Sequence, residues 1–373
     1  MKYSIIRVLN LFTIMNRGGA ETMVMNYYRN IDREKVQFDF MVHRSEKGAY
    51  ENEINELGGK IFREPPIRPW SSTHYINAIK EFYSTHSEYK IIHSHMSELG
   101  YYDFLVAEKY NIPVRICHAH NAPHGIDLKS PIRWYYKKRM LPHITHMFTC
   151  GQESADWLFG KKNSGRFIQL NNAVDSEKFV YNEETEKEIR RRYGLRNRFI
   201  VGHVGRFSVQ KNHKFLIEIF NEIQKINPHS TLMLVGDGEL RSEVLDLAKK
   251  LKIEDKIIVT GFINNVNEVI QCFDAFVFPS LFEGLSVTSI ENQAAGNICF
   301  IPKEIPQQCV VTDNVNSISL KQSAYDWAKC IIDKSAEHQK QDMRNEITKA
   351  GFDIKSNAKW LEEFYINEYN KYK

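Results

Sequence analysis

Two glutamates stand eight positions apart in the segment FEGLSVTSIENQAAG, which covers residues 282–296. Residues 286–295 have the composition of a short helix, and Gly296 is a suitable residue to end it. Glu283 therefore precedes the helix, and Glu291 lies inside it. Amides at the start of a helix attract an anion, and carboxylates beside an anion need hydroxyl donors. The spacing predicts a ligand with an anionic centre and hydroxyls at both ends; a capping carboxylate plus a solvated glutamate is the alternative.

Two cations precede a second predicted helix. In HVGRFSVQKNH, residues 203–213, an apolar run ends at Gly205, and Arg206 and Lys211 follow. Glycine lets the backbone approach a ligand closely. Arg and Lys five residues apart can contact two phosphates from different sides. This segment predicts a diphosphate site, with two solvated surface cations as the alternative.

A glycine pair, Gly18 and Gly19, lies in the loop NRGGAET between the first predicted strand and the first predicted helix. The loop does not match the G-x-G-x-x-G pattern of dinucleotide-binding proteins. The pair therefore serves either a ligand that approaches the backbone or the geometry of a turn.

Histidines are dense near the ends of two short apolar runs, KIIHSH and VRICHAH: they are His93, His95, His118, His120 and His124. Histidines at strand ends can bind a substrate hydroxyl or a metal. The helical zinc spacings HxxxH and HExxH are absent, and no carboxylate cluster accompanies the histidines. We therefore do not expect a zinc site.

The segment PIRWYYKKRMLPH, residues 131–143, mixes four cations with aromatic and apolar side chains. Such a mixture suits a membrane surface that carries anionic lipid. A solvated helix that packs its aromatic side chains into the core fits the same residues, and both interpretations stay open.

Short apolar runs alternate with helical or polar stretches in two series. The first series extends from IIRVLNLF to HMFTCG, and the second from FIVGHVGR to ICFI. This alternation builds parallel sheets with helices on both faces, and 373 residues exceed one core. We predict an α/β protein of two doubly wound domains, residues 1–170 and 171–355, with a last helix at 356–373 that packs back on the first domain.

Composition limits the function classes. The formal net charge is +4, with the positive excess in the first 180 residues, which is too small for a nucleic-acid-binding surface. Six scattered cysteines without a CxxC pair indicate a reducing compartment. The apolar N-terminal run is interrupted by Arg7 and Asn10 and reads as a strand, not a signal peptide. No run reaches the ~20 apolar residues of a membrane helix, and we expect a cytoplasmic protein.

Taken together, these residues resemble the family 4 glycosyltransferases, enzymes of the GT-B fold with two facing Rossmann-like domains. The resemblance spans nearly the whole chain and rests on GGAE at 18–21, NNAVD at 171–175, GRF…K at 205–211, GDGELR at 236–241 and EGLSVTSIE at 283–291. It implies a retaining transferase that uses a nucleotide-activated sugar. The first domain would bind the acceptor and the second the donor.

The resemblance also implies residue roles. Arg206 and Lys211 would hold the donor diphosphate, Glu283 would contact the transferred sugar, and Glu291 would bind the ribose hydroxyls. A histidine near the reacting centre is expected at His120, with His118 as the alternative. The remaining donor-binding positions are Gly18, Gly19, Gly236, Gly284, Leu285, Ser286 and Val287.

No metal or other cofactor is expected. The chain has no DxD motif, and Asp237 is read as a turn residue. Arg206, Lys211 and the helix amides would then stabilise the leaving diphosphate.

The leading hypothesis is transfer of a hexose-type sugar, from a UDP-sugar, to a glycan or lipid-linked acceptor in capsule or exopolysaccharide biosynthesis. The protein would work in the cytoplasm, with 131–143 as a contact to the inner face of the membrane. A nucleotide-sugar 2-epimerase and a non-catalytic nucleotide-sugar-binding subunit are the alternatives. Ser286 and Asn292 stand where relatives commonly have proline and alanine, and NICFIPKEIPQQCV lacks their glycine-containing loop, which leaves the donor sugar open.

Overall fold

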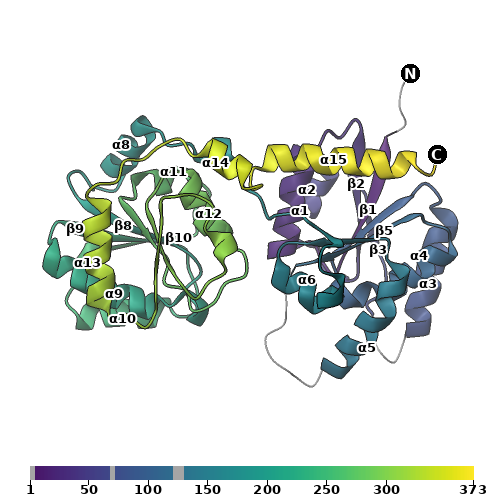
Figure 1. Cartoon of the computed structure of the whole chain (residues 1–373), viewed down its shortest axis with the longest axis horizontal. Coiled ribbons are helices and arrows are strands. Elements are labelled where there is room, and N and C mark those ends of the chain that lie inside the picture. Colours follow the sequence, from purple (N-terminus) through teal and green to yellow (C-terminus); the bar gives the residue numbers. More distant parts are fainter. Residues whose placement is uncertain (1–4, 68–71, 121–129) are drawn as a thin grey trace. The chain divides into compact units, whose positions relative to one another are not determined.

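The computed structural model describes residues 5–67, 72–120 and 130–373. The chain divides into two compact units (Figure 1). One unit comprises Met1–Ala173 and Ile354–Lys373, and the other comprises Val174–Asp353. The sequence predicts these divisions after residues 170 and 355, and the structure has them after Ala173 and Asp353. Among the described residues, no helix is long and apolar enough to cross a membrane.

The described part of the first unit contains a seven-stranded parallel sheet in the order β3-β2-β1-β4-β5-β6-β7. Its strands are β1 (Ile6–Phe12), β2 (Val36–Val42), β3 (Ile61–Arg63), β4 (Ile91–Ser94), β5 (Val114–Ala119), β6 (His146–Thr149) and β7 (Phe167–Gln169). Its helices are α1 (Gly19–Asn30), α2 (Glu51–Glu56), α3 (Ser72–Thr85), α4 (Tyr101–Lys109), α5 (Ser130–Met140), α6 (Gln152–Phe159) and α15 (Ile354–Asn370).

Side chains of β1 show why this sheet is covered on both faces. Successive strand residues point to opposite faces, and Ile6 and Val8 enter one apolar cluster while Leu9 and Leu11 enter another. Both clusters are buried, as expected for a parallel sheet between two helix layers. The predicted doubly wound α/β class is therefore confirmed for this unit.

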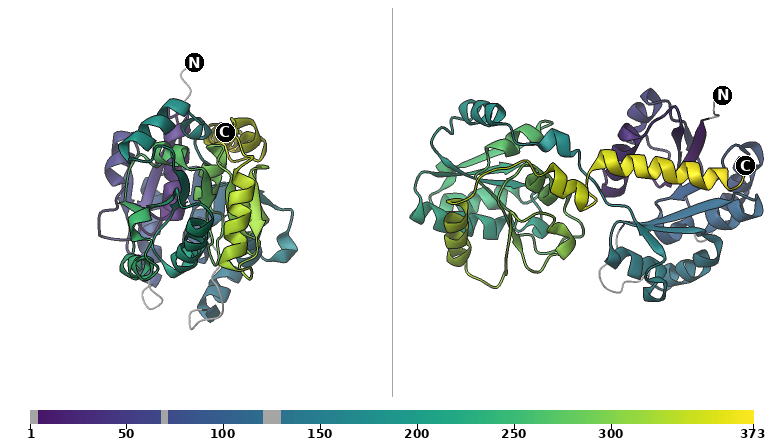
Figure 2. Two further views of the ribbon diagram at one scale, coloured as in Figure 1. Left: turned by 90° about the vertical axis from the view of Figure 1, so that its left-hand side faces the viewer. Right: turned by 45° about the horizontal axis from the view of Figure 1, so that its top comes forward.

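The C-terminal helix α15 lies along α1 and the β1–β2 part of the sheet (Figures 1 and 2). Its buried face carries Leu361 and Tyr365. Trp360 on the same helix is 42% exposed and stacks on Phe364. The helix thus completes the apolar cluster on one side of the first sheet.

The second unit contains a six-stranded parallel sheet in the order β10-β9-β8-β11-β12-β13, all of it within the described range 174–353. Its strands are β8 (Phe199–Val204), β9 (Ser230–Val235), β10 (Ile257–Gly261), β11 (Ala275–Val277), β12 (Cys299–Pro302) and β13 (Val315–Ile318). Its helices are α7 (Ser176–Phe179), α8 (Glu183–Arg192), α9 (His213–Ile226), α10 (Arg241–Lys250), α11 (Val266–Val269), α12 (Val287–Ala294), α13 (Ala324–Ser335) and α14 (Arg344–Lys349).

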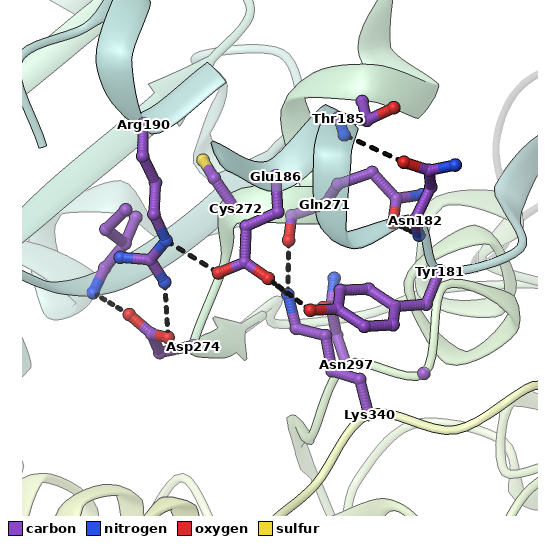
Figure 3. Close-up of polar contacts among 12 residues, drawn as sticks. Tyr181, Asn182, Thr185, Glu186, Arg190, Gln271, Cys272, Asp274, Asn297 and Lys340 are labelled. Atoms are coloured by element: carbon purple, nitrogen blue, oxygen red, sulfur yellow. Dashed lines mark hydrogen bonds and ion pairs between the residues drawn. The ribbon is translucent and has the colours of Figure 1, made fainter. Parts of the chain in front are cut away.

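A polar network holds α8 against the second sheet (Figure 3). Arg190 contacts Glu186 and Asp274 at 2.6 Å each, and Glu186 accepts a hydrogen bond from Tyr181 at 2.7 Å. Lys340, whose side chain is 10% exposed, donates to the backbone carbonyl of Gln271. The two cations and two carboxylates neutralise one another, which is the usual condition for charges at a low-dielectric site.

The strand order reverses direction at one place in each sheet. In the first unit β1 lies between β2 and β4, and in the second unit β8 lies between β9 and β11. In open α/β sheets, ligands bind outside the carboxyl ends of the strands at this switch point. The loops after β8 and β11 contain Arg206, Lys211 and Glu283, so the second unit places three predicted site residues there.

Candidate functional site

Three hydrogen bonds tie the loop after β8 to the loop after β11. The amide of Leu281 donates to the carbonyl of Gln210 at 2.8 Å, and the side chain of Gln210 donates to the carbonyl of Phe282 at 3.0 Å. Asn212 adds a side-chain bond to the carbonyl of Pro279 at 3.1 Å. The two loops therefore form one surface at the switch point.

Lys211 and Glu283 form an ion pair on this surface. Lys211 Nζ lies 2.7 Å from Glu283 Oε1, and only 16% and 7% of the two side chains are exposed. The ammonium group also lies 4.4 Å from the centre of the Phe278 ring, a cation–π contact. A cation suited to phosphate and a carboxylate suited to hydroxyls are thus fixed side by side.

Arg206 lies on the same loop but is far more exposed. Its side chain is 71% exposed and pairs with Glu239, with Arg206 Nε 3.0 Å from Glu239 Oε2. An exposed pair of this kind contributes little free energy, so the guanidinium is free to exchange this partner for a ligand. Of the two predicted phosphate-binding cations, Lys211 is held in place and Arg206 is available at the surface.

Gly236 supports the loop that carries Arg206. Its φ of +133° is a conformation that side-chain-bearing residues rarely adopt. A Cβ atom there would lie 2.2 Å from the carbonyl oxygen of Gly205. Glycine at 236 is therefore required for the backbone to pack against residue 205, whatever its part in donor binding.

The helix α12 begins at the predicted place. Ser286 is its N-cap and accepts a hydrogen bond from the amide of Ser289 at 3.3 Å, which a proline at 286 could not do. The amide of Ser286 lies 3.5 Å from Cys309 Sγ. Gly284 is exposed, with open space where a Cβ would stand. The segment of Gly284, Leu285, Ser286 and Val287 is thus ordered by capping while leaving room at Gly284.

Glu291 is the fifth residue of α12. Its side chain is partly exposed, and desolvation of the carboxyl group by the surrounding protein raises its pKa to about 7. Throughout the described residues, no side chain or amide donates to this carboxyl group. A carboxylate with unused acceptor positions suits hydroxyl groups of a ligand. Asn292, beside it, is buried and accepts a hydrogen bond from Asn297 at 3.0 Å. Asparagine in place of the alanine of relatives therefore serves internal packing at position 292.

Gly18, Gly19 and His120 belong to the first unit. Gly18 is the N-cap of α1, and a Cβ there would meet the Glu21 carboxylate, whereas Gly19 faces open space. His118 is fully buried inside β5, while His120 follows the strand and is partly exposed. Between the two alternatives, His120 is the one that reaches the surface. His124 lies outside the described residues.

The structure adds a cysteine, Cys150, to the histidines that the sequence shows at the ends of two apolar runs. His93, His95 and His118 form one cluster, and His118, His120 and Cys150 form another, with nitrogen or sulfur atoms within 4.8 Å of one another. Cys150 follows β6, the strand next to β5. The sequence could have indicated this neighbour, because Cys150 ends the run HMFTCG and the ends of neighbouring parallel strands meet at one edge of a sheet.

The segment 131–143 forms α5 and a short 3₁₀ turn. Lys137 turns inward, donates to the carbonyl of Trp157 and lies 4.8 Å from its ring centre. Lys138 and Arg139 are exposed, and so are three large side chains of the same helix: Ile132, Trp134 and Tyr135. The exposed side chains fit contact with a membrane surface, whereas the buried Tyr136 and Met140 fit a helix that packs into the core. Both interpretations therefore stay open.

Two family models match the chain. The model for glycosyl transferases group 1 matches residues 185–353, and that for glycosyltransferase family 4 matches residues 17–178. Together they span both units.

Relatives cover the chain from end to end. EpsF of Bacillus subtilis (strain 168), named as a glycosyltransferase, is 32% identical, with 98% of this chain and 96% of EpsF aligned. An Escherichia coli enzyme, UDP-Gal:alpha-D-GlcNAc-diphosphoundecaprenol alpha-1,3-galactosyltransferase, is 22% identical over 98% of both chains. The crystal structure of Anabaena Alr3699/HepE in complex with UDP has a TM-score of 0.73 at 16% identity and covers 98% of both chains. The chain therefore belongs to the family 4 glycosyltransferases, and its two Rossmann-like units are the domains of the GT-B fold.

Proposed function

We propose that the protein is a retaining hexosyltransferase that takes its sugar from a nucleotide-sugar, a UDP-sugar in particular. The Lys211–Glu283 pair carries this proposal, because it sets a cation for the diphosphate next to a carboxylate for the transferred sugar. Arg206 would leave Glu239 and add a second contact to the diphosphate. The names of the E. coli enzyme and of the Anabaena complex, which include UDP-Gal and UDP, support uridine as the base.

The two glutamates divide the donor between them. Glu283, paired and little exposed, would contact the transferred sugar, and Glu291, whose acceptor positions are unused among the described residues, would bind the ribose. The amides that open α12 would face the diphosphate, where the helix dipole favours negative charge. This division keeps both carboxylates on hydroxyl groups and away from phosphate oxygens.

The acceptor would be a growing glycan or a lipid-linked sugar in the biosynthesis of a surface polysaccharide, bound by the first unit. The E. coli relative acts on a diphosphoundecaprenol-linked sugar, which supports this class of acceptor. The exposed side chains Ile132, Trp134, Tyr135, Lys138 and Arg139 of α5 would contact the anionic membrane that holds such a lipid.

The test is a panel of UDP-, GDP- and ADP-sugars, screened first by thermal shift and then with mixed lipid-linked and glycan acceptors. We expect one UDP-sugar to raise the melting temperature and to give a new glycoside by mass spectrometry with release of UDP. An isomeric nucleotide-sugar formed without acceptor would instead assign 2-epimerase activity. Binding with no product of either kind, across all acceptors, would assign a non-catalytic subunit.

A further inference from the structure

A continuous series of polar contacts in the first unit connects Asn10 in β1 with Tyr365 in α15. It passes through four histidines and one cysteine, and each consecutive pair lies within hydrogen-bonding distance. In order along the line, the residues are Asn10, His95, His120, Cys150, His118, His93 and Tyr365. The two ends come from opposite ends of the sequence.

Asn10 determines which partner donates and which accepts in the hydrogen bonds along this line. Its side-chain amide nitrogen lies 3.4 Å from the carbonyl of Val8 and 3.5 Å from that of Asp39, both acceptors. Its oxygen Oδ1 must therefore be the atom that faces His95 Nε2, at 3.3 Å. An amide oxygen only accepts hydrogen bonds, so His95 carries its proton on Nε2.

Neutral imidazole has one donor and one acceptor nitrogen. Once one nitrogen of a ring is known to donate, the other must accept, so the assignment extends to the next residue. Burial lowers the pKa of His95, and that of His120 to about 3, so both rings are neutral near pH 7. His95 Nδ1 is then an acceptor, and His120 Nε2, 2.8 Å away, donates to it. His120 Nδ1 accepts in turn, from the Cys150 thiol at 3.3 Å.

The same rule continues to the far end. Burial raises the pKa of Cys150 to about 12, so the thiol keeps its proton. Met23 Sδ, 3.5 Å away, is the weaker of its two acceptors. His118 Nε2 donates to Cys150 Sγ at 3.5 Å, and His93 Nε2 donates to His118 Nδ1 at 3.2 Å. Tyr365 then donates to His93 Nδ1 at 2.7 Å, so every group along the line is satisfied with one arrangement of protons.

We infer that Cys150 and His95 are positioning residues for His120: they hold its ring in the Nε2–H tautomer and occupy both of its nitrogens. His120 then contributes to the reaction through the position of its ring and backbone at the end of β5, and not through proton transfer. The consequence for catalysis rests on the proposed function, whereas the proton arrangement rests on the contacts alone.

A transition metal is the competing occupant of the same side chains. His118, His120 and Cys150 offer two imidazole nitrogens and a sulfur within 4.8 Å of one another. A metal would require the thiolate and would remove the Cys150 proton on which the line depends. The unbroken series of contacts, in which the thiol proton faces His120 Nδ1 and Sγ accepts from His118, favours the protonated thiol.

The experiment is ¹⁵N NMR of histidine-labelled protein, with the His120 signal assigned from a His120→Gln sample and metal content measured on the same protein. We expect neutral Nε2–H tautomers for His93, His95, His118 and His120, and no bound zinc or copper. Cys150→Ser, which keeps a donor and an acceptor, should preserve the His120 tautomer. Cys150→Ala should give a mixture of tautomers at His120 and lower kcat ~10- to 100-fold, with nucleotide affinity unchanged.

An Nδ1–H tautomer or an imidazolium at His120 in the wild type would overturn the inference. So would one equivalent of metal that is lost in Cys150→Ala, or an unchanged His120 tautomer in that variant. If Cys150→Ala does not fold, Asn10→Leu replaces it, because loss of the oxygen acceptor should leave His95 and His120 without a fixed direction. The NMR and metal results stand even when no transfer reaction is found, so failure of the proposed function is a separate outcome.

Discussion

Lys211 Nζ and Glu283 Oε1 lie 2.7 Å apart although 72 residues separate them in the sequence. Each follows a different strand of the second sheet, β8 or β11, and those strands are neighbours at the point where the strand order reverses. The pair forms because the two loops bind each other through Gln210 and Asn212. Contacts between the two loops thus fix a cation beside a carboxylate at the switch point.

The first prediction concerns the diphosphate contacts. Arg206→Ala and Lys211→Ala should each weaken binding of the free nucleotide diphosphate by about 1.5–3 kcal/mol, roughly 10- to 150-fold, because charge-assisted contacts are lost. Isothermal calorimetry measures this. Lys214→Ala is the matched control, since Lys214 is an exposed cation in the nearby α9 that pairs with Glu243. Wild-type affinity in both variants would place the diphosphate contacts elsewhere.

Donor affinity should depend on pH through Glu291. Burial raises the pKa of this carboxyl group to about 7 in the free protein, and ribose hydroxyls donate best to the ionised form. Binding should therefore release a proton and strengthen as pH rises, by up to about tenfold per unit below pH 7, and level off above it. A nucleotide-sugar is the proper ligand, because its esterified diphosphate does not titrate in this range.

Glu291→Gln is the control for the pH dependence. The amide cannot ionise, so its affinity curve should be flat between pH 5.5 and 8, roughly the range over which the wild type changes. Parallel curves for the two proteins would mean that another group titrates on binding, and that Glu291 does not contact the ribose.

Turnover should survive removal of divalent cations. In the proposed mechanism Lys211, Arg206 and the amides of α12 would supply positive charge to the leaving diphosphate, and the chain has no DxD motif to hold a cation there. Initial rates in EDTA should equal those in magnesium. A rate that vanishes in EDTA and returns with magnesium or manganese would contradict this expectation.

The proposed membrane contact of α5 depends on its exposed cations, Lys138 and Arg139. Lys138→Glu with Arg139→Glu should abolish co-sedimentation with phosphatidylserine vesicles at low salt, by removing attraction and adding repulsion. Lys137 is left in place because it contacts Trp157. The control pair Lys161→Glu and Lys162→Glu, exposed on the same unit, should still sediment. A wild-type protein that stays in the supernatant would make α5 an ordinary surface helix.

The sequence predicted the main elements well where apolar runs were long. It placed the start of α12 within one residue, because Ser286 is a capping residue and Gly296 ends the pattern. It missed β7 and β13, which have only three and four residues, lie at sheet edges and are partly polar. Such strands form by pairing with a neighbour, and a local pattern does not contain that information.

The candidate site could be predicted only in part, for a related reason. The spacing of Glu283 and Glu291 is local, so their positions around the start of α12 followed from the sequence. The pairing of Glu239 with Arg206, and the gathering of Asn10, Cys150 and Tyr365 around the histidines, depend on contacts between distant segments. For the histidines, the sequence showed their positions at the ends of two apolar runs but not which nitrogen meets which partner.

Steady-state kinetics of Glu283→Gln and Glu291→Gln at saturating acceptor is the most direct test of the central claim, the division of the donor between the two carboxylates. The ribose changes little during reaction, so Glu291→Gln should mainly raise KM for the donor. The transferred sugar gains positive charge as the diphosphate leaves, so Glu283→Gln should mainly lower kcat and leave nucleotide diphosphate affinity intact. The same KM-only defect in both variants, or wild-type kinetics in both, would contradict the account.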